Sequence, residues 1–150
     1  MDYNYLNFNW IIEGALAGAI GATDRNDLYY FKMQEIRSVV RLDENCISAE
    51  PWQLTELYEP VTAAEDLNGE QIHRITIFIE EQFEKWERPV VVTCGTGLER
   101  TGVILACYLV LVGHQAQSAI NLIQDFRNGS LNTDSQKHIV FDYEKMLRSV

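Results

Sequence analysis

The sequence has few cysteines, few positive charges and no long apolar run. Of its 150 residues only three are cysteines, Cys46, Cys94 and Cys107. They are too few and too scattered for a disulfide framework, and their odd number leaves a free thiol. Twelve lysines and arginines stand against 22 aspartates and glutamates, which gives a net charge of -10. Nucleic-acid binders and proteins that coat anionic membranes need clustered cations, so this balance argues against both.

Metal-binding and targeting patterns are also missing. No two cysteines have metal-ligand spacing, and His73, His114 and His138 lie in no Cys/His cluster, so we expect no metal or other cofactor. Residues 1–9 are polar and aromatic, without the basic start and apolar run of a secretory signal. The longest apolar stretch, 103–112, is far too short for a membrane span. We therefore expect a reduced, cytoplasmic, soluble monomer.

The length predicts one domain covering residues 1–150. Strand-like segments alternate with helical ones, and the chain ends all helical, which favours an α/β fold with a central, mostly parallel β-sheet flanked by helices. Asn26 or Asp27 can cap the first helix. The expected strands lie within 10–21 and at 36–42, 54–58 and 90–92, and the expected helices at 27–35, 67–86, 101–112, 115–128 and 132–146, with a loop at 62–69.

One segment, residues 90–102, has the composition of an anion-binding loop. A buried strand ends at Cys94, a glycine-containing loop follows, and Arg100 opens a helix. Successive loop N–H groups can point inward, the helix start adds partial positive charge, and Gly95 and Gly97 permit the tight backbone that this requires. Arg100 offers a planar fork that matches two phosphate oxygens. The segment therefore predicts a phosphate-binding loop, or P-loop.

The same positive field stabilises a thiolate, which makes Cys94 a candidate nucleophile for covalent catalysis. The alternative is that Cys94 is a buried apolar residue and the glycines form an ordinary strand-to-helix turn. The arginine six residues after Cys94, the glycine three residues after it and the Thr-Gly pair after the arginine favour the phosphate site. Cys107 lies in an apolar helix and is expected to pack in the core.

This segment resembles the Cys-x5-Arg-Ser/Thr signature of protein tyrosine and dual-specificity phosphatases. Residues 9–18 are similar to the opening of the small single-domain members, and 104–110 to their helix after the loop. Residues 127–136 resemble their Arg-Pro-Gly-Ser-x-x-Thr-x-x-Gln segment. The match covers nearly the whole chain, but 43–69 is dissimilar.

The resemblance implies a role for each matching residue. Cys94 would be the nucleophile and Arg100 the phosphate clamp, the hydroxyl of Thr101 would ease departure of the thiolate, and Gln136 would help to place the hydrolytic water. The phosphate-binding residues would be Gly95, Thr96, Gly97, Leu98, Glu99 and Arg100.

The chain departs from the family pattern at two positions in this segment. Thr93 stands where the family usually has histidine before the nucleophile, and we expect its hydroxyl to order the loop and Cys94 to be less acidic than usual. Glu99, beside Arg100, weakens the positive field. It either turns to solvent or pairs with a cation, or it is a general acid, the role assigned to an acidic residue at this position in myotubularin-like phosphatases.

The family's general-acid loop usually reads Pro-Asp-x-x-x-Pro, and here the aspartate position falls on Ala63. Protonation of the leaving group needs a carboxylic acid within reach. Asp66 can supply it if the loop is shortened, because Asp66-Leu67 mimics the family's Asp-Phe pair, and Glu65 can also reach. Both residues can instead cap or complement the following helix. The acid candidates are therefore Asp66, Glu65 and Glu99, in that order.

The expected function is that of an enzyme, a cysteine-dependent phosphomonoester hydrolase of the protein tyrosine or dual-specificity type. It would act on a phosphorylated protein or a small phosphomonoester through a phosphocysteine. Phosphotyrosine is the favoured substrate, because an aryl leaving group needs less protonation. Two alternatives remain: a phosphoinositide or small-metabolite phosphatase, and a phosphate-binding pseudophosphatase with weak or no catalysis.

Overall fold

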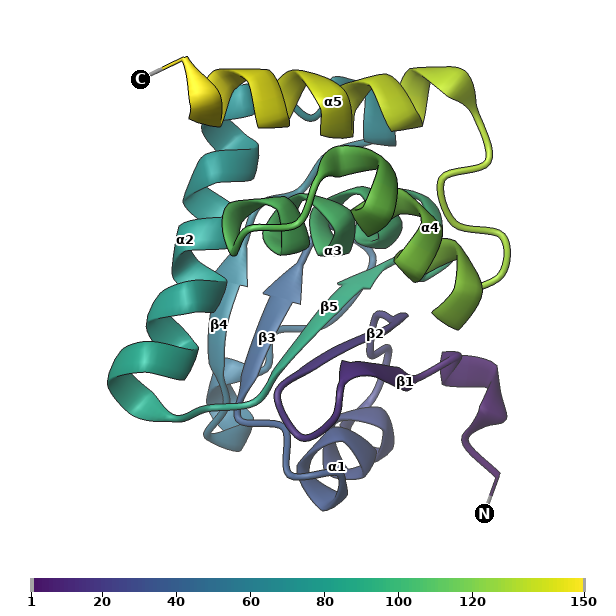
Figure 1. The fold of residues 1–150 in the computed structure, drawn as a ribbon. Coiled ribbons are helices and arrows are strands. Elements are labelled where there is room, and N and C mark those ends of the chain that lie inside the picture. Colours follow the sequence, from purple (N-terminus) through teal and green to yellow (C-terminus); the bar gives the residue numbers. More distant parts are fainter. Residues whose placement is uncertain (1, 150) are drawn as a thin grey trace.

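A five-stranded sheet organises the chain (Figure 1). The computed structural model describes residues 2–149. The strands lie in the order β1 (Asn9–Ile12), β2 (Leu16–Ile20), β5 (Val90–Cys94), β3 (Ser38–Arg41) and β4 (Thr55–Tyr58). Only the β1–β2 pair is antiparallel, and the other three pairs are parallel. The expected mostly parallel sheet is therefore confirmed, with Cys94 at the carboxyl end of its central strand.

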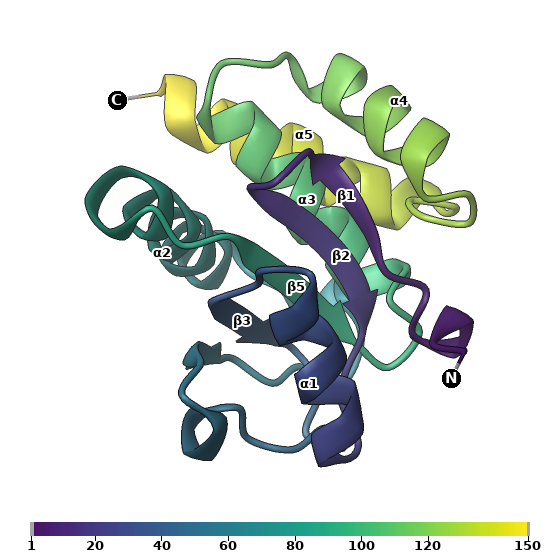
Figure 2. The same ribbon diagram turned by 90° about the horizontal axis from the view of Figure 1, so that it is seen from below.

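Helices cover both faces of the sheet (Figure 2). Helix α1 (Arg25–Met33) lies on one face, and α2 (Gly69–Trp86), α3 (Glu99–Leu111), α4 (Ala116–Phe126) and α5 (Asp134–Arg148) lie on the other. No helix in the described part of the chain is both long and apolar enough to span a bilayer.

Strand β5 is apolar on both sides because both faces of the sheet are covered. Side chains alternate along a strand, so Val90, Val92 and Cys94 join the core under helices α2–α5, while Val91 joins the smaller core under α1. Thr93 is buried between strands and donates its hydroxyl to the Val40 carbonyl at 3.0 Å. The expectation that this hydroxyl orders the loop is wrong, because it ties β5 to β3 instead.

The first helix, α1, begins two residues earlier than the sequence pattern predicts. Asp24 is the N-cap, and its side chain accepts the N–H of Asp27 at 3.1 Å, so neither Asn26 nor Asp27 is the cap. Asp27 is buried instead and accepts hydrogen bonds from Tyr5 and from the Thr23 N–H. A carboxylate with partners from outside its helix is a long-range feature that capping rules do not include. The expected loop at 62–69 also contains a short 3-10 turn, η3 (Ala64–Asp66).

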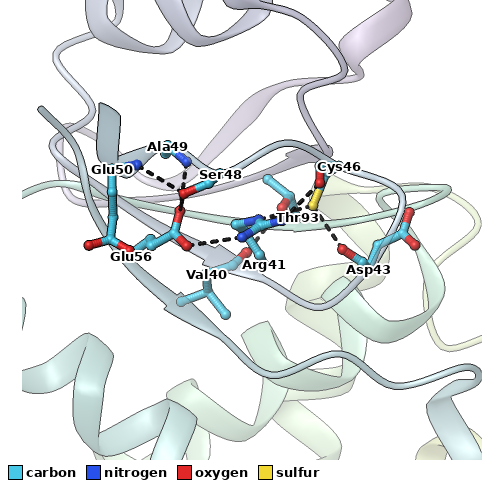
Figure 3. A network of polar contacts seen from close by, with 9 residues as sticks. All are labelled: Val40, Arg41, Asp43, Cys46, Ser48, Ala49, Glu50, Glu56 and Thr93. Atoms are coloured by element: carbon cyan, nitrogen blue, oxygen red, sulfur yellow. Dashed lines mark hydrogen bonds and ion pairs between the residues drawn. The ribbon is translucent and has the colours of Figure 1, made fainter. Parts of the chain in front are cut away.

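A buried ion pair holds the connection between β3 and β4, which contains the 3-10 turn η2 (Glu50–Trp52) (Figure 3). Arg41 Nη1 lies 2.9 Å from Glu56 Oε2, and both side chains are at most 10% exposed. Arg41 Nη2 also donates to the Cys46 carbonyl at 2.8 Å. The other Glu56 oxygen accepts the Ala49 N–H at 2.6 Å and the Ser48 hydroxyl at 3.0 Å. One carboxylate thus fixes the path of a loop that runs beside the carboxyl end of β5.

The charge of Arg41 is compensated on several sides. Burial alone lowers the pKa of its guanidinium, but hydrogen bonds and charge attraction with Cys46 and Glu56 outweigh burial and raise that pKa. The Tyr58 ring covers the guanidinium at 4.2 Å. Removal of the Glu56 carboxylate would therefore leave the buried Arg41 guanidinium without its ion-pair partner.

Glu56→Ala is expected to lower the free energy of unfolding by about 3–5 kcal/mol, because it leaves the Arg41 cation and the Ala49 N–H buried without their acceptor. Glu56→Gln keeps an acceptor oxygen and should cost less. Exposed Glu50 is the matched control, and Glu50→Ala should change stability by no more than about 0.5 kcal/mol. Urea unfolding measures all three, and an equal loss in Glu56→Ala and Glu50→Ala would contradict the assignment.

Candidate active site

The candidate site is the turn that joins β5 to α3. Cys94 is fully buried, and its Sγ accepts the N–H of Thr101 at 3.4 Å. The Thr101 hydroxyl points elsewhere and donates to the Val92 carbonyl at 3.4 Å. The thiol therefore meets a backbone donor in the first turn of a helix, where anions are stabilised.

The second thiol in this part of the core has a different environment. Cys107 is fully buried within α3, and burial raises the pKa of its thiol. Its expected role in core packing is confirmed. The described cysteines are all free thiols.

The loop between Cys94 and α3 presents backbone donors. Among the described residues, none accepts a hydrogen bond from the amides of Gly95, Thr96 or Gly97. The next two amides, of Leu98 and Glu99, donate to the Thr96 hydroxyl at 3.1 and 3.4 Å. Gly97 has a φ of +71°, in the region that favours glycine, and this turns the loop back toward the helix. Such a run of amides fits an anion with several oxygens.

Arg100 reaches across the site from the first turn of α3. Its Nη1 donates to the carbonyls of Val61 at 2.7 Å and Leu42 at 3.3 Å, which lie just after β4 and β3. Its Nη2 lies 3.0 Å from the position that a Cβ on Gly95 would take. One arm of the fork is thus anchored to the neighbouring loops, and the other lies over the P-loop. This geometry suits a clamp that holds two oxygens of one phosphoryl group.

Asp43 is a carboxylate that sequence reasoning missed at this site. Its Oδ2 lies 3.2 Å from the same Cβ position on Gly95, and the residue is 9% exposed. The other oxygen accepts the Asn45 N–H at 3.1 Å. The sequence signal that could have found it is its place two residues after β3, because the carboxyl ends of parallel strands share one edge of the sheet.

The three acid candidates have different surroundings. The carboxylate of Asp66, at the end of η3, is exposed and has no hydrogen-bond partner among the described residues. Glu65 accepts a hydrogen bond from the Ser135 hydroxyl at 3.0 Å. Glu99 is exposed in the first turn of α3, and no ion pair to it forms within residues 2–149. The side chain of Glu99 therefore faces solvent and does not pair with a cation in the described part of the chain.

Gln136 lies at the start of α5, next to the residue that holds Glu65. It is 4% exposed, and its backbone N–H donates to Thr133, the N-cap of α5. Its side-chain Oε1 is buried and has no partner among the described residues. A buried carbonyl oxygen of this kind is satisfied in most proteins by a protein donor or by ordered water.

Arg127 is the second residue that sequence reasoning missed, although it opens the 127–136 segment. Its Nε and Nη2 donate to the Gly97 carbonyl at 3.0 and 2.6 Å. Its Nη1 donates to the carbonyls of Asn7 at 2.7 Å and Gly18 at 3.0 Å, and to the side chain of Asn9. Burial lowers the pKa of this guanidinium to about 10, while attraction to Cys94 opposes the effect. Arg127 thus holds the outer side of the P-loop.

Within residues 2–149, no three His, Cys, Asp or Glu side chains converge in a way that could hold a metal ion. The positive charge at the site comes from Arg100, the loop amides and the start of α3. A phosphoryl group could be held by these groups alone.

The fold and sequence comparisons agree with this geometry. The family model described as the Swiss Army Knife protein, DSP-PTPase phosphatase domain, matches residues 6–140. The chain therefore belongs to this family of phosphatase domains, and the resemblance to protein tyrosine and dual-specificity phosphatases is confirmed.

Solved structures that are similar to this chain in fold include the following three, although their sequence identity with it is low. Tk-PTP in its active form shares 22% identity with a TM-score of 0.80, over 92% of this chain and 96% of that one. PTPMT1 in complex with PI(5)P shares 16%, with a TM-score of 0.81, over 95% and 97%. Human DUSP28 shares 13%, with a TM-score of 0.77, over 93% and 96%. The fold is thus that of protein tyrosine phosphatases.

Arg127→Met is expected to lower the free energy of unfolding by about 3 kcal/mol, because the buried carbonyls of Gly97 and Gly18 lose this donor, and a buried polar group without its partner costs about 1–3 kcal/mol. Arg127→Lys keeps the charge but not the fork, and should recover only part of the loss. Exposed Arg148 is the control, where the change to Met should cost at most about 1 kcal/mol. Urea unfolding tests this, and a cost for Arg127→Met equal to that of Arg148→Met would rule out the role.

Proposed function

We propose that this protein is a cysteine-dependent phosphomonoester hydrolase that acts through a phosphocysteine intermediate. The observation that carries the proposal is the position of Cys94 Sγ, which accepts the Thr101 N–H at the start of α3 and directly precedes three loop amides, of Gly95, Thr96 and Gly97, that have no acceptor among the described residues. Family membership supports the proposal. A site that only binds phosphate needs no nucleophile, so a cysteine at this position of the loop favours an enzyme over a simple phosphate binder.

The proposed reaction has two displacement steps. The phosphoryl group binds to the loop amides and to the free arm of Arg100, and the Cys94 thiolate attacks phosphorus in line. The S–P bond forms as the bond from phosphorus to the leaving oxygen breaks, and a carboxylic acid gives that oxygen its proton. Water then attacks phosphorus and gives a proton to the carboxylate left by the first step, and the S–P bond breaks to release inorganic phosphate and the thiolate. We assign stabilisation of the departing thiolate to the Thr101 N–H, since the hydroxyl is engaged with Val92.

Gln136 is proposed to place the attacking water. Its Oε1 can accept a hydrogen bond from water, and its own backbone is fixed by the cap of α5. Its neighbour Ser135 contacts Glu65 in the segment after β4, so the start of α5 and the segment with two acid candidates are linked. This arrangement would bring the second-step water and the proton-transfer group to the same side of the phosphoryl group.

Phosphotyrosine in a protein is the favoured substrate class. A phosphoinositide or other densely phosphorylated substrate is the second candidate, and a fold relative, PTPMT1, has been solved with PI(5)P. The loop 94–100 contains no lysine, and the carboxylate of Asp43 borders it. Those charges disfavour a ligand with several phosphates more than a ligand with one.

Wild-type protein should hydrolyse an aryl phosphate and a phosphotyrosine peptide, and Cys94→Ser should lose turnover while keeping affinity for inorganic phosphate. Loss of turnover follows because serine is not deprotonated at neutral pH. Phosphate release and isothermal calorimetry measure the two properties. Absence of hydrolysis by the wild type, with phosphate binding retained, would instead support the pseudophosphatase alternative.

Asp66 is expected to be the general acid, because its carboxylate is exposed, has no hydrogen-bond partner among the described residues and lies in the segment after β4 whose Val61 carbonyl accepts from Arg100. Asp66→Asn should therefore lower kcat for a phenyl phosphate by about a hundredfold or more and remove the basic limb of its pH profile. An activated aryl phosphate, whose leaving group needs no proton, should be hydrolysed almost normally. Glu65→Gln, Glu99→Gln and Asp43→Asn are the matched comparisons, and loss of the basic limb in one of these alone would reassign the acid to that residue.

A further inference from the structure

A pocket of about 350 Å³ lies outside the P-loop, between α1 and η2. Its lining combines positive charge, aromatic rings and one amide, and no acidic side chain contributes. We call it the α1–η2 pocket. It is lined by Arg25, Asn26, Leu28, Tyr29, Lys32 and Trp52.

The pocket concentrates cations on a protein that has few. Arg25, Tyr29 and Lys32 recur at helical spacing and share one face of α1. Arg25 is exposed and has no hydrogen-bond or ion-pair partner among the described residues. Lys32 donates one ammonium proton to the Trp52 carbonyl at 3.1 Å, which leaves two for a ligand. Two of the twelve basic residues of the chain thus point at one hollow.

Aromatic surface accompanies these charges. Tyr29 is 63% exposed and Trp52 is 41% exposed, although rings of this size are buried in most proteins. An exposed pair of rings beside two cations is typical of a surface that binds a peptide, because rings contribute contact area at low entropic cost and the cations fix carboxylates. The lining therefore fits a segment with both acidic and apolar side chains.

The pocket and the candidate active site share one edge of the sheet. Gly21, directly after β2, donates its N–H to the Cys94 carbonyl at 3.1 Å. Arg25 follows four residues later, so the backbone path from Gly21 to Arg25 spans at most about 14 Å. An extended peptide covers that span in about four residues. One chain can therefore place a phosphorylated side chain in the P-loop and another side chain in the pocket.

We propose that the α1–η2 pocket binds an acidic segment that flanks the phosphorylated residue of a protein substrate. This inference rests on the proposed function, since it names the substrate of the same site. Arg25 pairs with a carboxylate about four positions from the phosphorylated residue, and Lys32, which lies about 10 Å further along α1, pairs with a carboxylate about three positions beyond it. Tyr29 and Trp52 contact the apolar parts of the same segment. The pocket thus supplies the sequence preference that a single arginine and backbone amides do not.

A short acidic peptide suits the pocket better than other anions do. A polyanion such as nucleic acid would be attracted by the two cations of the pocket. Over the rest of its length it would be repelled by a protein whose net charge is -10. A peptide needs only local contact, because charges beyond about 8 Å are largely screened at physiological salt. The preference should therefore weaken at high salt, where the two pairs themselves are screened.

Paired phosphotyrosine peptides test the proposal. One member carries acidic residues about four and about seven positions from the phosphotyrosine, on its amino side or its carboxyl side, and the other carries the corresponding amides there. With wild-type protein, one acidic peptide should show a KM about fivefold lower than its amide counterpart, at equal kcat. The double variant Arg25→Gln/Lys32→Gln should lose this preference and keep its activity on an aryl phosphate. Lys85→Gln/Lys145→Gln, which removes two exposed charges elsewhere, should keep the preference.

Binding to the Cys94→Ser variant, followed by fluorescence anisotropy of labelled peptides, separates the two claims. If the wild type hydrolyses nothing, the proposed function fails, while tighter binding of an acidic peptide that depends on Arg25 and Lys32 still supports the pocket. Equal affinity for acidic and amide peptides on both sides of the phosphotyrosine would overturn the pocket. An equal loss of preference in the two double variants would also overturn it, since the effect would then be one of net charge.

Discussion

The buried guanidinium of Arg127 is the contact on which the geometry of the site depends. It joins the P-loop, through the Gly97 carbonyl, to the chain before β1 and to strand β2. These segments are far apart in sequence, and each leaves a carbonyl that needs a donor. A guanidinium has five N–H donors in a fixed plane, so one side chain can satisfy all of them and set their relative positions. The hydrogen bonds from Arg127 to the Gly97 carbonyl also stabilise the left-handed backbone conformation of Gly97.

A similar principle applies on the other side of the loop. There Arg100 is anchored by the carbonyls of Val61 and Leu42, and the path of the chain after Leu42 is fixed by the buried pair of Arg41 and Glu56. The two arginines have opposite tasks. All three guanidinium nitrogens of Arg127 donate to protein acceptors, whereas Arg100 keeps one arm over the P-loop. A loop of this kind can bind an anion without collapsing because its rigid partners lie outside it.

The sequence predicted the fold well because local and global signals agree. Strands β2 and β5 are apolar on both faces, helix α3 is apolar all round, and the turn from Cys94 to Arg100 combines glycines with the start of a helix. The residues that sequence reasoning missed act over long distances. Asn9 and Arg127 are 118 positions apart, and Asp43 approaches Gly95 only because β3 and β5 are neighbours. Thr93 was misjudged for the same reason, since its hydroxyl acceptor belongs to β3.

The net charge of -10 is compatible with an anion site because the amides of the loop provide a local positive field. The hydroxyl of Thr96 accepts from part of this field. Two loop amides donate to this hydroxyl, in the manner of a helix cap. A neutral hydroxyl satisfies these donors less strongly than a charged oxygen does. A phosphoryl dianion can therefore displace it, and the exchange costs little because one acceptor replaces another. With the carboxylates of Asp43 and Glu99 in the same region, the proposed binding of phosphate depends on this local exchange of acceptors and not on long-range attraction.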